Sequence, residues 1–345
     1  MLDFLREYGL FVLELVTVLG LFAVVVLVVL RAARRGGDMP SPSHGHLKVS
    51  HLGDKFRRLR LTIQQQTLTP KQWKVLVKQE DAADKARDKQ PSSKPRIFVV
   101  DFVGDVRASA VESLRQEVSA IVQAVQPGDE VMVRLESPGG MVHSYGLAAS
   151  QLARFREAKI PLTICVDKVA ASGGYMMACV ADTIVAAPFA VLGSIGVVAQ
   201  LPNLNRLLKK MDVDYEIVTA GKWKRTLTVL GENTDEGRAQ FKREIDNTHQ
   251  LFKDFIAHNR PKLDLEAVAD GRTWYGTEAR DIQLCDAVAT SDDWLLQRAD
   301  KAELIAVSWQ MRRGMGERLG SLAAVTLGRV TDSLAQHELQ RSAGL

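Results

Sequence analysis

A serine in a small-residue turn and a lysine further along the chain are the residues best suited to do chemistry. Ser172 lies within residues 170–175 (Ala-Ala-Ser-Gly-Gly-Tyr), between an apolar strand pattern and an apolar helix pattern. Such a turn can expose a nucleophilic hydroxyl, but serine needs a base near neutral pH. No histidine occurs between Ser172 and His249, so the sequence favours an amine over an imidazole as that base. Lys224, within residues 221–225 (Gly-Lys-Trp-Lys-Arg), is the candidate amine.

The surroundings of Lys224 suit this role but do not single it out. A lysine can act as a base when burial lowers its pKa. Trp223 lies beside Lys224, and the mainly apolar residues 217–219 come shortly before it. Lys222 is the rival, because residues two apart in an extended segment face the same side and spacing cannot choose between them. A hydroxyl such as that of Ser194 could orient the amine.

Three glycine-containing turns each follow a predicted strand, so they could meet at one edge of a parallel sheet. They cover residues 137–140, 172–174 and 193–196. Acyl chemistry at Ser172 would need two N–H donors about 2.7–3.1 Å from the developing oxyanion. Glycine lets the backbone come close to a substrate, because no Cβ is in the way. We expect Gly173 to supply one donor and either Gly139 or Gly140 the other.

Strand-like and helix-like patterns alternate through the middle of the chain and must position these turns. The strand-like runs are residues 96–102, 130–136, 161–167 and 182–187. The helix-like runs between them are residues 108–125, 145–158 and 173–181. This alternation indicates βαβ units and a largely parallel sheet, which assigns the chain to the α/β class.

An almost unbroken apolar run occupies residues 9–30. About 22 residues rising about 1.5 Å each would extend roughly 33 Å, enough to cross a bilayer core. The preceding residues are not basic, and residues 31–35 (Arg-Ala-Ala-Arg-Arg) do not resemble a cleavage site, which favours an uncleaved transmembrane helix over a signal peptide. The arginines and lysines after the run predict, by the positive-inside rule, that the rest of the chain lies in the cytoplasm.

The sequence divides into four predicted regions. They are a transmembrane anchor (9–30), a linker with a charged helical stalk (31–94), a compact domain (95–297) and a basic amphipathic tail (298–345). The stalk contains two helix-prone segments, residues 55–66 and 70–89. His44, His46 and His51 have no cysteine or clear carboxylate partner nearby, so we expect no metal site there.

The charge and the cysteines exclude other classes. The formal net charge of +4 is spread along the chain without a basic stretch interleaved with aromatic residues, so no nucleic-acid partner is expected. Cys165, Cys179 and Cys285 each lie in an apolar run, which indicates buried free thiols rather than disulfides or a zinc site. No cofactor is predicted.

As a set, the motifs resemble the signal peptide peptidase A family of serine–lysine proteases, which share the crotonase/ClpP superfold. The resemblance covers about residues 95–293, and the anchor and stalk also match a membrane-anchored member. It implies a crotonase/ClpP-like core of βαβ units, preceded by one N-terminal transmembrane helix and a charged helical stalk. The matching motifs are Leu135-Glu136-Ser137-Pro138-Gly139-Gly140, Ala170-Ala171-Ser172-Gly173-Gly174-Tyr175, Leu192-Gly193-Ser194-Ile195-Gly196-Val197, Ala220-Gly221-Lys222-Trp223-Lys224-Arg225 and Gly271-Arg272-Thr273-Trp274-Tyr275-Gly276.

This resemblance implies a role for each candidate residue. It makes Ser172 the nucleophile and chooses Lys224 over Lys222 as the general base. It gives Ser194 the task of hydrogen-bonding the lysine. It assigns the oxyanion hole to Gly173 together with Gly139 or Gly140.

The resemblance also implies an assembly and a location. Family members form rings or domes, and single-repeat members complete the serine–lysine dyad between neighbouring subunits. This chain has one serine motif and one lysine motif, so we expect a homo-oligomer with a dyad shared between chains. The family is expected to act at the periplasmic face of the bacterial inner membrane, which conflicts with the positive-inside prediction and leaves the face open.

The function predicted from these observations is a membrane-bound serine endopeptidase with a Ser-Lys dyad. Its expected substrates are short hydrophobic peptides, signal-peptide remnants or misfolded envelope proteins. Two alternatives remain: an acyl-CoA hydratase or isomerase of the crotonase type, which would not need Ser172 and Lys224, and a catalytically inactive membrane scaffold.

Overall fold

The computed structural model describes residues 45–89 and 94–311 of the chain. Contacts divide the chain into two units, of which one is Leu47–Trp309 and the other combines residues 1–46 with 310–345. The second unit lies almost entirely outside the described residues, and so does the predicted anchor at residues 9–30. Within the described ranges, no helix has both the length and the apolar character needed to span a membrane.

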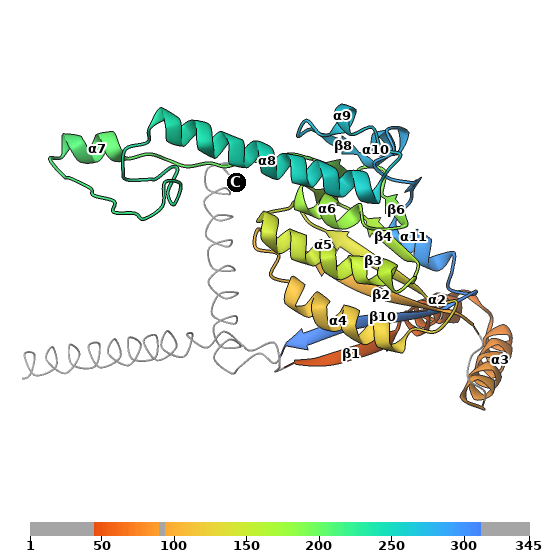
Figure 1. The fold of residues 1–345 in the computed structure, drawn as a ribbon. Coiled ribbons are helices and arrows are strands. Elements are labelled where there is room, and N and C mark those ends of the chain that lie inside the picture. The colour runs from red at the N-terminus through yellow and green to blue at the C-terminus, as the bar shows by residue number, and fades with distance from the viewer. Residues whose placement is uncertain (1–44, 90–93, 312–345) are drawn as a thin grey trace, which may run out of the picture. The chain divides into compact units, whose positions relative to one another are not determined.

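A seven-stranded sheet forms the centre of the domain (Figure 1). Every pairing from β10 to β9 is parallel, as the alternation of strands and helices predicted. Parallel strands need long crossovers, and helices provide them here. In spatial order the strands are β1 (Gly45–His51), β10 (Glu303–Met311), β2 (Arg96–Val103), β3 (Glu130–Glu136), β4 (Leu162–Val166), β6 (Thr183–Ala186) and β9 (Ala287–Val288).

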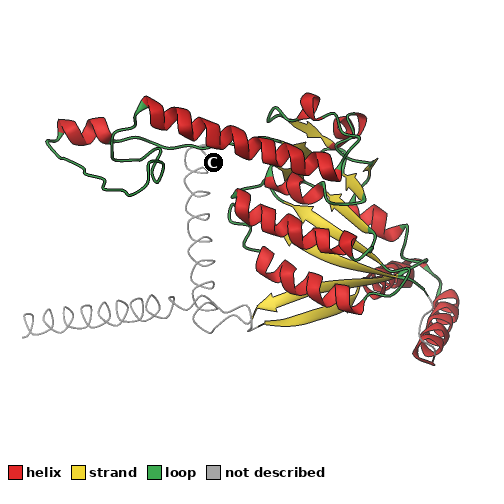
Figure 2. Ribbon diagram, in the orientation of Figure 1, coloured by secondary structure: helices red, strands yellow, loops and turns green. Residues whose placement is uncertain are grey.

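Helices cover both faces of this sheet, which explains why its strands are almost continuously apolar (Figure 2). Val99 packs in a cluster with Trp294, whereas the next residue, Val100, packs on the opposite face in a cluster with Leu114. One face carries α4 (Val111–Ala124), α5 (Val142–Glu157), α6 (Gly173–Ala178) and α8 (Asp235–Asn259). The other face carries α2 (Leu52–Thr67) and α11 (Ser291–Leu296). The predicted α/β class is confirmed.

A second, three-stranded sheet stands at the carboxyl edge of the first. It contains β5 (Val169–Ala171), β7 (Val191–Gly193) and β8 (Thr273–Tyr275). The short helix α9 (Leu265–Val268) precedes β8, and α10 (Gly276–Asp281) follows it. The pairing of β5 with β7 is parallel and that of β7 with β8 antiparallel. An isolated parallel bridge joins Ser137, just after β3, to Ala170 of β5. This small sheet therefore brings all three glycine-containing turns together.

Residues 199–232, which we call the arm, project from the domain. The arm contains one short helix, α7 (Asn205–Lys210), and otherwise irregular chain that extends beyond the N-terminal end of α8 (Figure 1). Asn203 ties its two ends together, because its side-chain amide donates to the carbonyl oxygens of Thr228 and Gly231 at 2.9 and 3.0 Å. Most residues of the arm are exposed.

The structure extends the domain on both sides of the boundaries predicted at residues 95 and 297. β10, which falls in the predicted tail, pairs with β2 through Leu304 and Ile97 and is buried on both faces. β1, which falls in the predicted linker, forms the edge of the same sheet. The sequence did not single out β10, because a strand that inserts between two others shows no turn signal separating it from the preceding helix. The two stalk helices appear as α2 and α3 (Pro70–Lys89).

Candidate active site

Ser172 lies between β5 and α6 in a backbone conformation that few residues adopt. Its φ is 52° and its ψ is −118°. A positive φ is uncommon for a residue with a Cβ, and a sparsely populated conformation costs on the order of 1–3 kcal/mol. The Ser172 N–H donates to the Gly193 carbonyl at 2.8 Å, which fixes the turn. The hydroxyl does not cap the helix that follows and is only partly buried, so it remains available for chemistry.

Gly139 touches the nucleophile turn so closely that no side chain would fit. A Cβ built on Gly139 would lie 2.7 Å from the Ser172 Cβ and 2.7 Å from the Gly173 nitrogen. The φ of Gly139 is +90°, a conformation that also disfavours any side chain. The turn after β3 and the turn after β5 are therefore held in contact by a glycine.

Hydrogen bonding separates the two candidate donors that the sequence left open. The Gly139 N–H already donates to Ser137 Oγ at 3.1 Å. Neither Gly140 nor Gly173 has a recorded acceptor for its N–H among the described residues. Gly140, Gly173 and Ser172 line the same pocket. The free donors near Ser172 are thus Gly140 and Gly173, and Gly139 acts as the spacer between the turns.

A buried tyrosine that the sequence motifs did not single out supports both turns. Tyr145 of α5 is fully buried, and its hydroxyl donates to the Asp105 carbonyl at 2.8 Å. Ser137 Oγ lies 2.5 Å from the same hydroxyl and must be the donor, since the tyrosine proton is already used. A Cβ on Gly173 would come within 2.4 Å of the Tyr145 ring. Burial raises the pKa of Tyr145, which keeps this donor protonated.

Ser194 directly follows β7, the strand that pairs with the one before Ser172. Ala171 of β5 and Gly193 of β7 are register partners in a parallel pair, so the two serines follow adjacent backbone positions. Ser194 also has a positive φ of 49°, and its N–H donates to the Arg272 carbonyl at 2.6 Å. The structure therefore brings the backbone positions of Ser172 and Ser194 together.

Lys224 is not brought to these serines within the single chain. It lies exposed on the arm, with no recorded side-chain contact to Ser172, Ser194 or any other described residue. Lys222, by contrast, forms an ion pair of 2.7 Å with Glu236 and lies over the Trp223 ring at 4.6 Å. The burial expected around the base is therefore missing in the isolated chain. Of the two lysines, Lys224 is the one whose amine remains uncommitted.

A small pocket beside Ser172 has an apolar lining. Its apolar side chains are those of Val142 of α5, Met176 of α6, Val197 and Phe252. Thr248 of α8 adds a hydroxyl. Because Phe252 and Thr248 belong to the helix that follows the arm, the position of the arm and the shape of this pocket are linked through α8.

Metal and thiol chemistry find no support at this site. The described ranges contain no group of histidine, cysteine and carboxylate side chains that could hold a metal ion. The three cysteines are free and buried, as predicted. Burial raises the pKa of Cys165 to about 12 and that of Cys285 to about 11, so neither thiol forms a nucleophilic thiolate near neutral pH. A strained serine beside unpaired backbone N–H groups is instead the arrangement of a serine hydrolase.

Comparison with known proteins places this chain in one family. The profile described as peptidase family S49 N-terminal matches residues 3–152, and that of peptidase family S49 matches residues 154–305. The probable protease SohB of Haemophilus influenzae is 44% identical over 333 residues, which cover 93% of each chain. The chain belongs to peptidase family S49 and is a serine-type peptidase.

Two further similarities differ in strength. The probable protease SohB of Buchnera aphidicola subsp. Acyrthosiphon pisum is 52% identical over 227 residues, or 66% of this chain and 68% of that protein. Among solved structures, a mutant of the 1510-N membrane-bound stomatin-specific protease aligns with a TM-score of 0.39 at 16% identity, covering 60% of this chain and 86% of that one. Family membership rests on the sequence relatives, and it removes the hydratase alternative.

Proposed function

We propose that this chain is a membrane-anchored endopeptidase in which Ser172 attacks the peptide bond and Lys224 is the general base. The local arrangement at Ser172 carries the proposal. Ser172 has a strained backbone and an uncommitted hydroxyl. The neighbouring N–H groups of Gly140 and Gly173 have no acceptor among the described residues. Strain of this kind persists where the surrounding structure enforces it, and it concentrates at active sites.

The proposed reaction follows from these groups. Ser172 Oγ attacks the substrate carbonyl while Lys224 Nζ accepts the hydroxyl proton. The N–H groups of Gly140 and Gly173 stabilise the oxyanion. Collapse of the tetrahedral intermediate breaks the C–N bond, and the lysine gives its proton to the leaving amine. Water then attacks the acyl-enzyme by the same route and releases Ser172. Ser194 holds the lysine amine by a hydrogen bond.

The base comes from a neighbouring copy of the chain. Lys224 is exposed in its own chain and makes no recorded contact with Ser172, while a lysine base needs burial. The arm also exposes apolar side chains, of which Val218 at 95% is the most exposed. Exposed apolar surface of this kind marks an interaction site. Docking of one chain's arm on the next would bury Lys224 beside Ser172 and complete the dyad in a homo-oligomer.

The substrate class follows from the pocket and the anchor. The apolar lining around Met176 and Phe252 favours an apolar side chain next to the cleaved bond. The apolar run at residues 9–30 would hold the enzyme on the bacterial inner membrane, next to its substrates. Short hydrophobic peptides, signal-peptide remnants and misfolded envelope proteins meet both conditions.

Replacement of each dyad residue tests the proposal. We expect Ser172→Ala and Lys224→Ala each to reduce kcat/KM on an unstructured protein substrate by roughly 1000-fold or more. Lys222→Ala is the matched control, because Lys222 is bound to Glu236 and should retain activity. Full activity of either dyad variant would refute the mechanism. Loss of activity in both, with retention in the Lys222 variant, would exclude the inactive scaffold.

A further inference from the structure

Four lysines of α3 form a row along one face of the helix. Lys71, Lys74, Lys78 and Lys85 are spaced by three, four and seven residues. At about 100° per residue, this spacing keeps all four within roughly 60° of one another around the helix axis, over a length of roughly 21 Å. All four are exposed. We call this row the lysine stripe.

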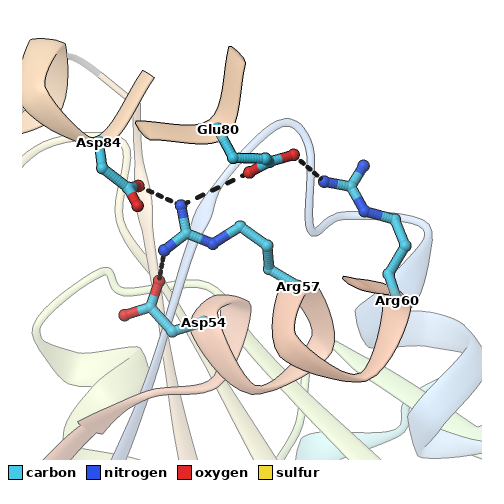
Figure 3. A network of polar contacts seen from close by, with 5 residues as sticks. All are labelled: Asp54, Arg57, Arg60, Glu80 and Asp84. Atoms are coloured by element: carbon cyan, nitrogen blue, oxygen red, sulfur yellow. Dashed lines mark hydrogen bonds and ion pairs between the residues drawn. The ribbon is translucent and has the colours of Figure 1, made fainter. Parts of the chain in front are cut away.

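The opposite side of α3 faces α2, and its acidic residues form ion pairs with arginines of α2. Figure 3 shows Arg57 of α2 in contact with Glu80 and Asp84 of α3, and Arg60 in contact with Glu80 at 2.5 Å. Arg57 also contacts Asp54 of its own helix at 3.3 Å. The half-buried residues Trp73, Leu76 and Val77 lie on this same side.

The charge of the lysine stripe is not compensated within the part of the chain that the structure describes. None of its four lysines forms an ion pair with a described residue, and Asp81, the exposed acid at its edge, pairs with none of them. Several other lysines of the domain differ. Lys242 pairs with Asp246 at 2.8 Å, and Lys168 pairs with Glu136 at 2.9 Å. The stripe is thus a row of positive charge that a polyanion can bind without displacing an acidic partner among the described residues.

We propose that the lysine stripe docks on the anionic phospholipid headgroups of the membrane that holds this protein. The apolar run at residues 9–30 predicts a bilayer close by. About 14 residues separate it from β1 and can reach at most roughly 50 Å, so the domain that carries α3 is tethered near that bilayer. Basic clusters on a helix near a membrane span bind anionic lipid surfaces. The inference rests on the predicted anchor and not on the dyad.

This docking has a predictable strength and salt dependence. Each lysine near an anionic surface strengthens binding roughly fivefold, so four together contribute on the order of several hundred-fold. Added salt weakens the attraction, because it shortens the screening length to a few ångströms at about 1 M. Docking would fix the orientation of α2 and α3 and, through Leu52 and Phe56 of α2, that of the domain above the membrane.

A fluorescent reporter on α3 tests the proposal in the full chain. Val75 is exposed beside the stripe, and Val75→Cys can be labelled with a polarity-sensitive dye. The native cysteines are buried, and burial raises the pKa of each thiol, so they react poorly with the dye. The labelled protein is reconstituted in vesicles of phosphatidylcholine, with or without phosphatidylglycerol, and the emission is compared.

Two charge-matched variants give the decisive contrast. In vesicles with phosphatidylglycerol we expect a blue shift that high salt reverses and that replacement of all four stripe lysines by glutamine abolishes. The control replaces four basic residues outside the arm that have acidic partners and should leave the shift intact: Arg115, Lys168, Lys242 and Lys253. Neither variant should lose peptidase activity on a soluble peptide, which separates this test from that of the dyad.

Either of two outcomes would overturn the proposal. One is an equal shift in both kinds of vesicle, or a shift that survives in the stripe variant, since the contact would then not depend on these charges. The other is binding of single-stranded nucleic acid by the stripe without any effect of phosphatidylglycerol, which would identify a different polyanion as the occupant.

Discussion

The turns around Ser172 and the arm that carries Lys224 are built in opposite ways. Around Ser172, a positive φ, a glycine in backbone contact and a buried tyrosine hydroxyl fix one geometry. Around Lys224, most of the chain is exposed, and its amine has no recorded partner among described residues. One half of the proposed dyad is complete within the chain, and the other half needs a second surface. Substitutions should therefore affect folding in the first region and assembly in the second.

A pair of glycine substitutions exposes this difference most strongly. Gly139 and Gly221 have similar φ values of +90° and +96°. A Cβ on Gly139 would strike backbone and Ser172, whereas a Cβ on Gly221 in the arm would meet nothing within 4 Å. We expect Gly139→Ala to lower the free energy of unfolding by about 3 kcal/mol or more and to abolish activity. Gly221→Ala should cost about 1 kcal/mol, from φ strain alone.

Thermal unfolding of both variants measures this contrast. A larger loss for Gly221→Ala than for Gly139→Ala would mean that the arm is the more constrained region, contrary to our account.

The pH dependence of stability should come from the domain and not from the arm. Glu117 of α4 is 5% exposed, and burial raises its pKa to about 7. The carboxylate accepts a hydrogen bond from the backbone N–H of Trp309 at 2.7 Å, which opposes this increase in pKa. The unfolded chain releases this proton near pH 4.5 and the folded chain only near pH 7. Stability therefore falls as the pH rises from about 4.5 to 7, by up to about 3 kcal/mol.

Glu117→Gln should remove this pH dependence, because the amide keeps an acceptor for Trp309 and carries no charge. Unfolding by denaturant across this pH range is the measurement. An unchanged slope in the variant would show that another group titrates.

Two buried tyrosines separate support of the active site from general stability. Tyr145 donates to the Asp105 carbonyl and Tyr175 to the Leu284 carbonyl, the latter at 3.0 Å. Loss of either hydroxyl should cost about 1–2 kcal/mol of stability. Only Tyr145→Phe also removes the acceptor of Ser137, so only this variant should lose kcat, by roughly tenfold, with little change in KM. Equal kcat in the two variants would assign Tyr145 a purely structural role.

An exposed arm residue should have the smallest effect on folding. Val218 makes almost no contact within its chain, so Val218→Asp should change the free energy of unfolding of a single chain by no more than about 0.5 kcal/mol. If the arm docks on a neighbour, the same variant should dissociate the oligomer and lose activity. Leu296→Asp on α11 is the exposed control and should do neither. Sedimentation measures the oligomeric state of both variants. An intact oligomer for Val218→Asp would count against docking through this residue.

The sequence predicted the strands β2, β3, β4 and β6 of the central sheet, but not β10 or the strands of the small second sheet. β3 matches its predicted range because its residues are apolar on both sides and turns bound it. β5, β7 and β8 were missed because three residues are too few to show a period. β10 was assigned to a tail because its partners lie far away in the chain.

The candidate site residues also divide into those that the sequence could predict and those that it could not. The candidates Ser172 and Ser194 could be found because small-residue turns after strands are a local signal, and the structure places them directly after paired strands. The proposal of Gly140 rather than Gly139 as an oxyanion donor needed the hydrogen bond from Gly139 to Ser137, which no spacing reveals. Tyr145 was missed because its partner Asp105 is 40 residues away. A tyrosine in an otherwise apolar helix face was the only available hint.

The most direct test of the central claim is to mix two inactive variants. Ser172→Ala retains the arm and its lysine, and Lys224→Ala retains the serine turn. If each site takes its serine from one chain and its lysine from a neighbour, mixed oligomers contain some sites with both residues. The account predicts that peptidase activity returns on mixing, at a fraction of the parent's level. No recovery in oligomers shown to contain both chains would contradict it.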